Sequence, residues 1–186
     1  MNNTLKMVIT LTLIGVISGG VLFAVNKWSE DYIREHSDNS TKDAIFQVIP
    51  GASDYKTKTS GKLKYFEVFD NKNKLAGYAL PCEGNGFQGK IKLMAGLSPD
   101  IEKITGIKIL EQTETPGLGS KITDNGFSGQ FVGLEVLPKI GCVKGKPAEN
   151  PNEIQAITGA TISSKSVVKI LNEGIKKLQE IVKEEN

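Results

Sequence analysis

The first stretch of the chain is apolar without interruption. Residues 7–26 contain no charged side chain, and Lys6 and Lys27 close this run on either side. Twenty helical residues span about 30 Å, which is the thickness of the hydrocarbon core of a bilayer. The pattern therefore predicts a transmembrane helix over residues 7–26. A cleaved signal peptide is the alternative, but residues 22–26 lack the small-x-small cleavage site that it needs.

A second helical pattern lies near the other end of the sequence. Apolar side chains recur with spacings of four, four, three and four residues at Val167, Leu171, Ile175, Leu178 and Val182. This spacing places them on one face of a helix, while charged residues fill the other faces. We expect a long amphipathic helix that packs on a core.

Shorter patterns between the two helices predict strands. Residues 63–69 and 74–80 are strand candidates, and the turn at 70–73 between them favours a hairpin. Residues 90–96 alternate polar and apolar side chains, and residues 101–110 form a further candidate. The pattern as a whole predicts an α+β fold with a small, mostly antiparallel sheet and flanking helices.

The other segments read as short helices or loops. A polar helix is expected to continue the anchor over residues 28–36 and to break at 38–40, and a second helix is expected over 41–48. Residues 127–132 are ambiguous. Residues 138–151 look like an irregular surface loop.

Three glycine-rich segments stand apart from these elements, at residues 84–89, 114–119 and 158–164. Loops of this type can line a site where a large flat ligand lies close to the backbone. They contain no nucleophile–base pair, no P-loop and no paired acids in a recognisable spacing. We therefore favour cofactor holding over hydrolysis and assign no catalytic residue.

The third segment is the most informative of these loops. Thr161 is expected where a loop turns into the N-terminus of the final helix, and free N–H groups and the helix dipole favour a phosphate there. Gly159 and Ala160 leave room for a bulky group. Lys165 could add a positive charge or could be an ordinary solvated lysine. The alternative is that Thr161 or Ser163 is a simple helix cap.

Composition excludes several classes of protein. The formal net charge is +2 and no basic stripe with interleaved aromatic residues occurs, so nucleic acid is not an expected partner. His36 is the sole histidine and is expected to be solvated. With Cys82 and Cys142 as the two cysteines, no metal or iron–sulfur site is expected. A disulfide between these cysteines and two free thiols both stay open.

The flanking charges indicate the orientation of the anchor. The N-terminal side carries Lys6 and the α-amino group without any acid, whereas the other side mixes both signs. The positive-inside rule then places residues 1–6 in the cytoplasm and residues 27–186 outside it, as one extracytoplasmic domain on the inner membrane. Gly15 and Gly19 form a GxxxG pattern that favours packing with another helix, although glycine is common in such helices.

Three motifs together carry a family resemblance. The sequences GFQG at 86–89, ETPGLG at 114–119 and TGATISS at 158–164 follow one N-terminal anchor in this order. This combination resembles the G subunit of Rnf-type ion-translocating ferredoxin:NAD oxidoreductases. The C subunit of the sodium-translocating NADH:quinone oxidoreductase is similar and shares the same FMN-binding domain. The resemblance extends over about residues 1–182.

The resemblance implies a covalent cofactor. In that family a flavin transferase outside the cytoplasm attaches FMN through its phosphate to the last threonine of the third motif, which is Thr161 here. The family's preferred motif has an acid six positions earlier, where this chain has Gln155. The further residues expected to contact the cofactor are Thr158, Gly159, Ala160, Ser163, Ser164, Lys165, Glu114, Thr115, Gly117, Leu118 and Gly119.

The implied function is that of an electron-transfer subunit. Its partners would be the other membrane subunits of an Rnf-type complex, which couples electron flow to Na⁺ or H⁺ translocation, and the subunit alone is not expected to turn over a substrate. Two alternatives stay open. One is a membrane-anchored assembly domain without flavin, which Gln155 keeps open, and the other is the FMN domain of a different extracytoplasmic reductase. The coupling ion, the redox potential and the immediate electron donor and acceptor do not follow from the sequence.

Overall fold

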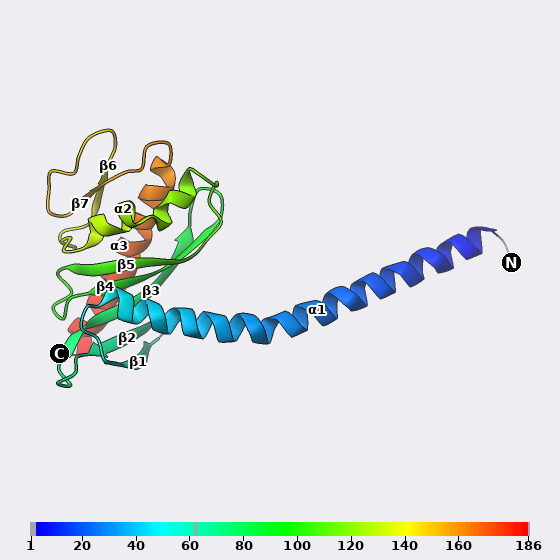
Figure 1. Ribbon diagram of the computed structural model, residues 1–186, viewed down its shortest axis with the longest axis horizontal. Helices are drawn as coiled ribbons and strands as arrows, with labels where there is room; N and C mark the ends of the chain where they lie inside the picture. Colours follow the sequence, from blue (N-terminus) through cyan, green and yellow to red (C-terminus); the bar gives the residue numbers. More distant parts are fainter. Residues whose placement is uncertain (1–2, 62, 186) are drawn as a thin grey trace. The chain divides into compact units, whose positions relative to one another are not determined.

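The chain is divided into two units, Met1–Ser40 and Thr41–Asn186. The computed structural model describes residues 3–61 and 63–185, with the side chains of 30–39 and 185 outside the description. The first unit consists of most of helix α1 (Asn3–Val48), whose last turns belong to the second unit (Figure 1).

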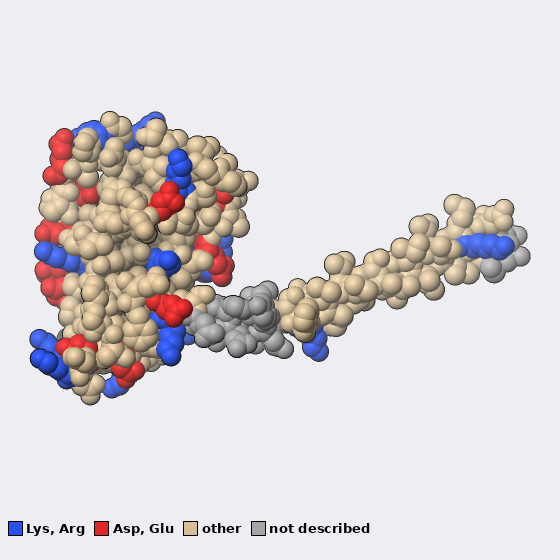
Figure 2. Space-filling view, viewed as in Figure 1, with Lys and Arg blue, Asp and Glu red and all other residues tan. Residues whose placement is uncertain are grey.

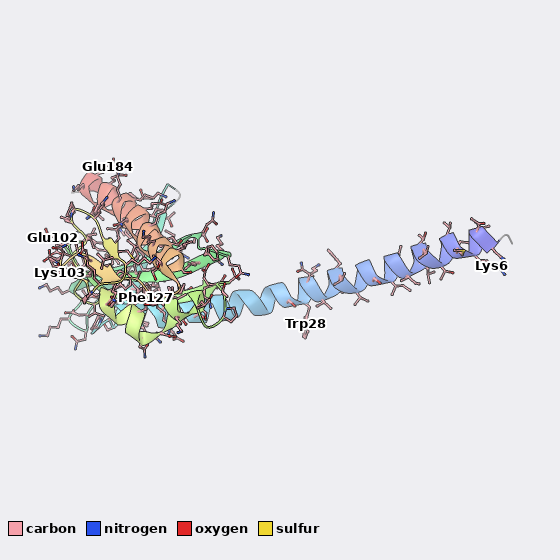
Figure 3. All side chains as sticks on the ribbon, turned by 90° about the horizontal axis from the view of Figure 1, so that it is seen from above. Lys6, Trp28, Glu102, Lys103, Phe127 and Glu184 are labelled. Atoms are coloured by element: carbon pink, nitrogen blue, oxygen red, sulfur yellow. The ribbon has the colours of Figure 1, made fainter. Side chains whose placement is uncertain are left out.

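Helix α1 contains the expected membrane span. Its part Asn3–Ser29 is long and apolar enough to cross a membrane, with a mean hydropathy of 2.4 and none of it buried. Figure 2 shows no charged side chain along this part of α1 between its two ends. Trp28 is 82% exposed and projects from the helix near the end of the apolar part (Figure 3). An aromatic residue at this position is typical of the membrane–water interface.

The predicted break at residues 38–40 is wrong, because α1 continues to Val48. Aspartate, asparagine and serine each cost well under about 1 kcal/mol in a helix, and neither glycine nor proline occurs between Gly20 and Pro50. The expectation for His36 lies outside the described side chains.

The second unit is built on a five-stranded antiparallel meander in the order β1-β2-β3-β4-β5 (Figure 1). The strands are β1 (Asp54–Ser60), β2 (Leu63–Phe69), β3 (Leu75–Asn85), β4 (Lys90–Leu97) and β5 (Ile104–Gln112). The four predicted strands are thus present, and the antiparallel sheet with its helices confirms the α+β fold. Strand β3 runs further than predicted and includes Gly84 and Asn85, because these residues pair with Ile91 and Lys90 of β4.

The sequence pattern does not predict strand β1. Its seven residues, DYKTKTS, contain one large apolar side chain, and most of them are exposed. Tyr55 alone packs on the core, and the rest of this edge strand is mostly solvated, so its sequence lacks the alternation that reveals a strand.

Apolar side chains cover both faces of the sheet. On one face, side chains such as Leu80 and Leu93 pack with Val167 and Leu171 of helix α3 (Thr161–Glu185), which is the predicted amphipathic helix. On the other face, the end of α1 packs through residues 44–49.

Short elements fill the space between β5 and α3. They are η1 (Gly119–Thr123), α2 (Asn125–Ser128), η2 (Gly129–Phe131), β6 (Gly141–Val143) and β7 (Glu153–Gln155), and β6 and β7 form a parallel pair. The ambiguous segment 127–132 is helical as far as Phe131, with Phe127 and Phe131 buried. The pattern predicts irregular structure throughout residues 138–151, but this segment contains β6. A three-residue strand is too short to give a periodic pattern.

Candidate functional site

Helix α3 begins at Thr161, as the sequence predicts. Ser164 N–H donates to Ala160 O at 3.0 Å, which is the first i−4 bond of the helix. The N–H groups of residues 161–163 therefore lie at the open, positive end of the helix. Thr161 is half-buried, and within the part of the chain that the structure describes its hydroxyl has no hydrogen-bond partner. This arrangement leaves a nucleophilic oxygen beside a site that favours an anion.

The buried carboxylate of Glu114 joins the three glycine-rich loops. Its Oε1 accepts hydrogen bonds from the N–H groups of Phe87 (2.9 Å) and Gln88 (3.1 Å), which lie in the turn between β3 and β4. Its Oε2 accepts the hydroxyl of Ser163, in the first turn of α3, at 2.5 Å. Segments that are 26 to 49 residues apart in the sequence thus meet at one side chain.

The surroundings of Glu114 favour its charged form. Burial raises the pKa of this carboxyl group, but the hydrogen bonds from Ser163 and from the backbone of residues 87–89 lower it, and the net pKa lies below its ordinary value. Glu114 is therefore ionised at neutral pH although only 4% of it is exposed.

The three loops line one cleft of about 330 Å³ in front of Thr161. This volume lies at the lower end of the range of small-molecule sites, about 300–1,000 Å³, so the cleft encloses part of a cofactor-sized ligand. Its lining residues are Phe87, Thr115, Leu118, Gly119, Lys144, Gly159, Ala160, Thr161, Ile162 and Ser163. Phe87 (63%), Leu118 (48%) and Ile162 (56%) are exposed, so the cleft offers an apolar surface suited to a flat aromatic ligand.

Two glycines explain why the loops can approach each other so closely. A Cβ on Gly119 would lie 2.7 Å from Ser163 Oγ and 2.8 Å from Glu114 Oε2. Gly159 has a φ of +84°, a conformation that other residues rarely adopt, and any Cβ there would lie 3.3 Å from Leu118. The shape of the cleft wall therefore depends on the absence of these side chains.

The expected site residues do not all lie at the cleft. Thr158 is exposed and lines a neighbouring cavity with Gln155 and Lys121. Lys165 is exposed on α3 and is not among the lining residues, and Gly117 sits in an exposed turn with a φ of +74°. Ser164 is buried and binds the loop itself, since its hydroxyl donates to Ala160 O and accepts from Ile157 N–H.

The site residues named from the sequence do not include three lining residues, Phe87, Lys144 and Ile162, and of these Lys144 lies outside the three expected loops. Lys144 supplies the exposed positive charge of the cleft, a role that the sequence suggests for Lys165. It lies in the segment whose pattern predicts an irregular loop, so no periodicity marks it. Phe87 and Ile162 fall inside two of the three motifs, and their exposure distinguishes them from core residues.

Both cysteines are free thiols. Burial raises the pKa of Cys82 to about 12. For Cys142, which is half-buried, burial raises the pKa and the charge of Lys165 lowers it, with a net increase. Of the two possibilities that the sequence leaves open, the structure has the free thiols.

Known proteins share this fold. Residues 86–176 match the family described as FMN-binding domain. NqrC of Shewanella oneidensis aligns with a TM-score of 0.56 and 25% identity, over 66% of this chain and 64% of that chain. The C subunit of the Na⁺-translocating NADH-quinone reductase from Parabacteroides distasonis shares the fold, with a TM-score of 0.62 at 19% identity, over 76% of this chain and 91% of that one. Fold and cleft define an FMN-binding domain that follows a membrane anchor.

Relatives of similar length identify the family. The G subunit of the ion-translocating oxidoreductase complex of Methanosarcina acetivorans is 30% identical over 91% of this chain and 92% of that protein. The G subunit of the Na⁺-translocating ferredoxin:NAD⁺ oxidoreductase complex of Acetobacterium woodii is 30% identical, over 96% and 93%. The chain belongs to the family of G subunits of Rnf-type ion-translocating oxidoreductase complexes. This confirms the resemblance that the three motifs carry.

The residues that line the cleft have the chemical character that binding of FMN requires. The open end of α3 and the charge of Lys144 suit a phosphate, while Phe87, Leu118 and Ile162 suit the flat apolar ring system. No step of hydrolysis or proton transfer needs to be assigned to these residues, since a flavin carries its own redox chemistry.

Proposed function

We propose that this protein is the electron-transfer subunit of a membrane-bound ferredoxin:NAD oxidoreductase of the Rnf type, and that it carries FMN bound covalently through phosphate to Thr161. The observation that carries the proposal is the position of the Thr161 hydroxyl. It lies at the N-terminus of α3, lacks a hydrogen-bond partner among the described residues, and lines the cleft that all three glycine-rich loops share.

The residues around Thr161 stabilise a negative charge. A phosphodiester keeps one charge, which the N–H groups at the start of α3 and the macrodipole favour by about 0.3–1 kcal/mol at an exposed site. Lys144 adds a positive charge on the opposite loop. Covalent attachment at this point fixes the phosphate end and leaves the ring system to lie along the cleft.

The apolar side chains of the cleft orient the ring system. Phe87 and Leu118 belong to the first and second loops, and Ile162 follows the attachment site. Phe87, Leu118 and Ile162 would hold a flavin in a cleft that is open to solvent, where the cofactor could exchange electrons with another redox centre. The protein thus binds and orients the flavin, which supplies the electron-transfer chemistry.

The proposal includes a topology and two kinds of partner. Residues 7–26 cross the membrane, residues 1–6 face the cytoplasm, and residues 27–186 face outward. There a flavin transferase of the kind that serves this family would transfer the FMN part of FAD to the Thr161 hydroxyl and release AMP. Other membrane subunits of the complex then donate and accept the electrons. Gln155, in the position of the preferred acid, is exposed at the end of β7, so its side chain is accessible to that transferase.

Intact mass spectrometry tests the assignment. Full-length protein co-expressed with its flavin transferase is expected to gain the mass of one FMN less one water and to fluoresce on a denaturing gel. Thr161→Ala is expected to lose this mass completely. Thr57→Ala is the matched control, because Thr57 is an exposed threonine on strand β1, outside the three loops and the cleft, and it should retain the flavin.

Two results would contradict the proposal. Covalent flavin that persists in Thr161→Ala would place the attachment elsewhere. Wild-type protein that binds no flavin, covalently or otherwise, would favour an assembly domain in which Thr161 has only a structural role.

A further inference from the structure

Glu114 is unusual because it is a charged side chain inside the protein. Among the described residues it is the one charged residue that is buried, and no lysine or arginine of that part forms an ion pair with it. An unpaired buried charge is costly unless several hydrogen bonds satisfy it. The buried carboxylate of Glu114 therefore depends on the hydrogen-bond donors around it, and these donors in turn depend on Glu114 as their acceptor.

The fold is shaped around this carboxylate. Both of its oxygens are used, with Oε1 on the N–H groups of Phe87 and Gln88 and Oε2 on the hydroxyl of Ser163. Gly86 and Gly119 leave the space that the two oxygens occupy, since a Cβ on either residue would collide with the carboxylate. A hydrophobic side chain at position 114 would require neither these donors nor the space that the two glycines leave.

We propose that Glu114 is a positioning residue of the flavin cleft, which joins the Phe87 turn to the first turn of α3 and keeps a fixed negative charge directly behind the cleft wall. This inference rests on the proposed function. The carboxylate does not line the cleft itself, but its partners Phe87 and Ser163 do, as does its neighbour Gly119.

The fixed charge has a consequence for a redox group in the cleft. Reduction adds electrons, and a negative charge separated from them by one layer of protein opposes that step. The depressed pKa of Glu114 keeps this charge present at neutral pH. Solvent screens it weakly, because the side chain is buried. Glu114 thus makes a bound flavin harder to reduce than the same cleft without the charge.

The substitution Glu114→Gln removes the negative charge of this side chain and keeps its shape. The amide has the same size, its oxygen can accept from Phe87 and Gln88, and its NH₂ group can donate to Ser163. Covalent loading at Thr161 should therefore continue. We expect the reduction equilibrium of the flavin to shift toward the reduced form on the order of tenfold, for an effective dielectric constant of about 20, which is 59 mV for one electron.

Glu111→Gln is the matched control. Glu111 lies three residues earlier in the sequence and is exposed. Its carboxylate forms an ion pair with Lys92, with an N–O distance of 2.8 Å, and it does not line the cleft. Its removal deletes the same charge without touching the loops, and the midpoint potential should stay at the wild-type value. An unchanged potential in Glu114→Gln, or an equal shift in Glu111→Gln, would overturn the electrostatic part of the proposal.

A second measurement needs no flavin. In the full-length Thr161→Ala background, Glu114→Ala is expected to accelerate amide hydrogen exchange of Phe87 and Gln88 by at least about tenfold, since each N–H loses its charged acceptor. Glu111→Ala should leave these two amides unchanged. Equal exchange in both variants would overturn the positioning role, whereas failure of wild-type protein to bind flavin would contradict only the proposed function.

Discussion

Three neighbouring hydroxyl groups at the start of α3 have three different environments. The Ser163 hydroxyl donates to Glu114, and the Ser164 hydroxyl holds the loop through Ala160 and Ile157. Thr161 faces the cleft. A simple cap at Ser163 is therefore wrong, because its hydroxyl binds another loop and not the N–H groups of its own helix.

The two thiols differ in a way that alkylation can measure. Because burial raises the pKa of Cys82 to about 12, it stays protonated at pH 9, where an exposed thiol is largely ionised. In native protein at pH 9, Cys82 should react with iodoacetamide at least about tenfold more slowly than Cys142, and both should react after unfolding. Peptide mass spectrometry of Cys82→Ala and Cys142→Ala assigns each rate, and equally fast labelling of both thiols in native protein would contradict the burial of Cys82.

Among the elements, the end of α1 makes the tightest approach to the sheet. The carbonyl of Val48 accepts the hydroxyl of Thr105 on β5 at 2.6 Å, and Gly96 of β4 leaves no room for a Cβ beneath it. The side chain of Thr105 thus satisfies a carbonyl at the end of α1 that has no helical partner.

Thr105→Val should therefore destabilise the second unit. It leaves the part-buried Val48 carbonyl without this donor, and we expect a loss of about 1–3 kcal/mol in the free energy of unfolding. Thr59→Val, on the exposed edge strand β1, should stay within about 0.5 kcal/mol of wild type. Urea denaturation of the full-length protein measures both, and equal stabilities would show that the Thr105 contact contributes nothing.

The sequence predicts the elements that are long and that bury an extended apolar face. Helix α3, the span in α1 and strands β2 to β5 each have a long apolar pattern, so these patterns are sufficient to predict them. Strand β1 has a single large apolar side chain, Tyr55, and β6 has three residues, so neither has a repeating pattern. The motifs locate the loops of the site, but the role of Glu114 depends on contacts between loops far apart in the sequence, which a single sequence does not encode in any local pattern.

At the scale of the whole molecule, the proposal requires the second unit to lie outside the cytoplasm. Ala148 is exposed in the loop before β7, and Asn3 is exposed at the other end of the membrane span. In a variant with Cys82→Ala and Cys142→Ala, Ala148→Cys should react with a membrane-impermeant maleimide in cells with only the outer layer permeabilised. Asn3→Cys is the matched control and should react only after lysis. The reverse pattern would place the domain in the cytoplasm and contradict the proposed topology.

The most direct test of the account is electron transfer through the assembled complex. The complex is purified with the wild-type, Thr161→Ala or Thr57→Ala form of this protein, and its content of the other subunits is matched. The account predicts that the Thr161→Ala complex passes electrons from reduced ferredoxin to NAD⁺ at least about a hundredfold more slowly, because the flavin site is lost, whereas the Thr57→Ala complex retains the wild-type rate. An undiminished rate in the Thr161→Ala complex would contradict the claim that electrons pass through a flavin held at this residue.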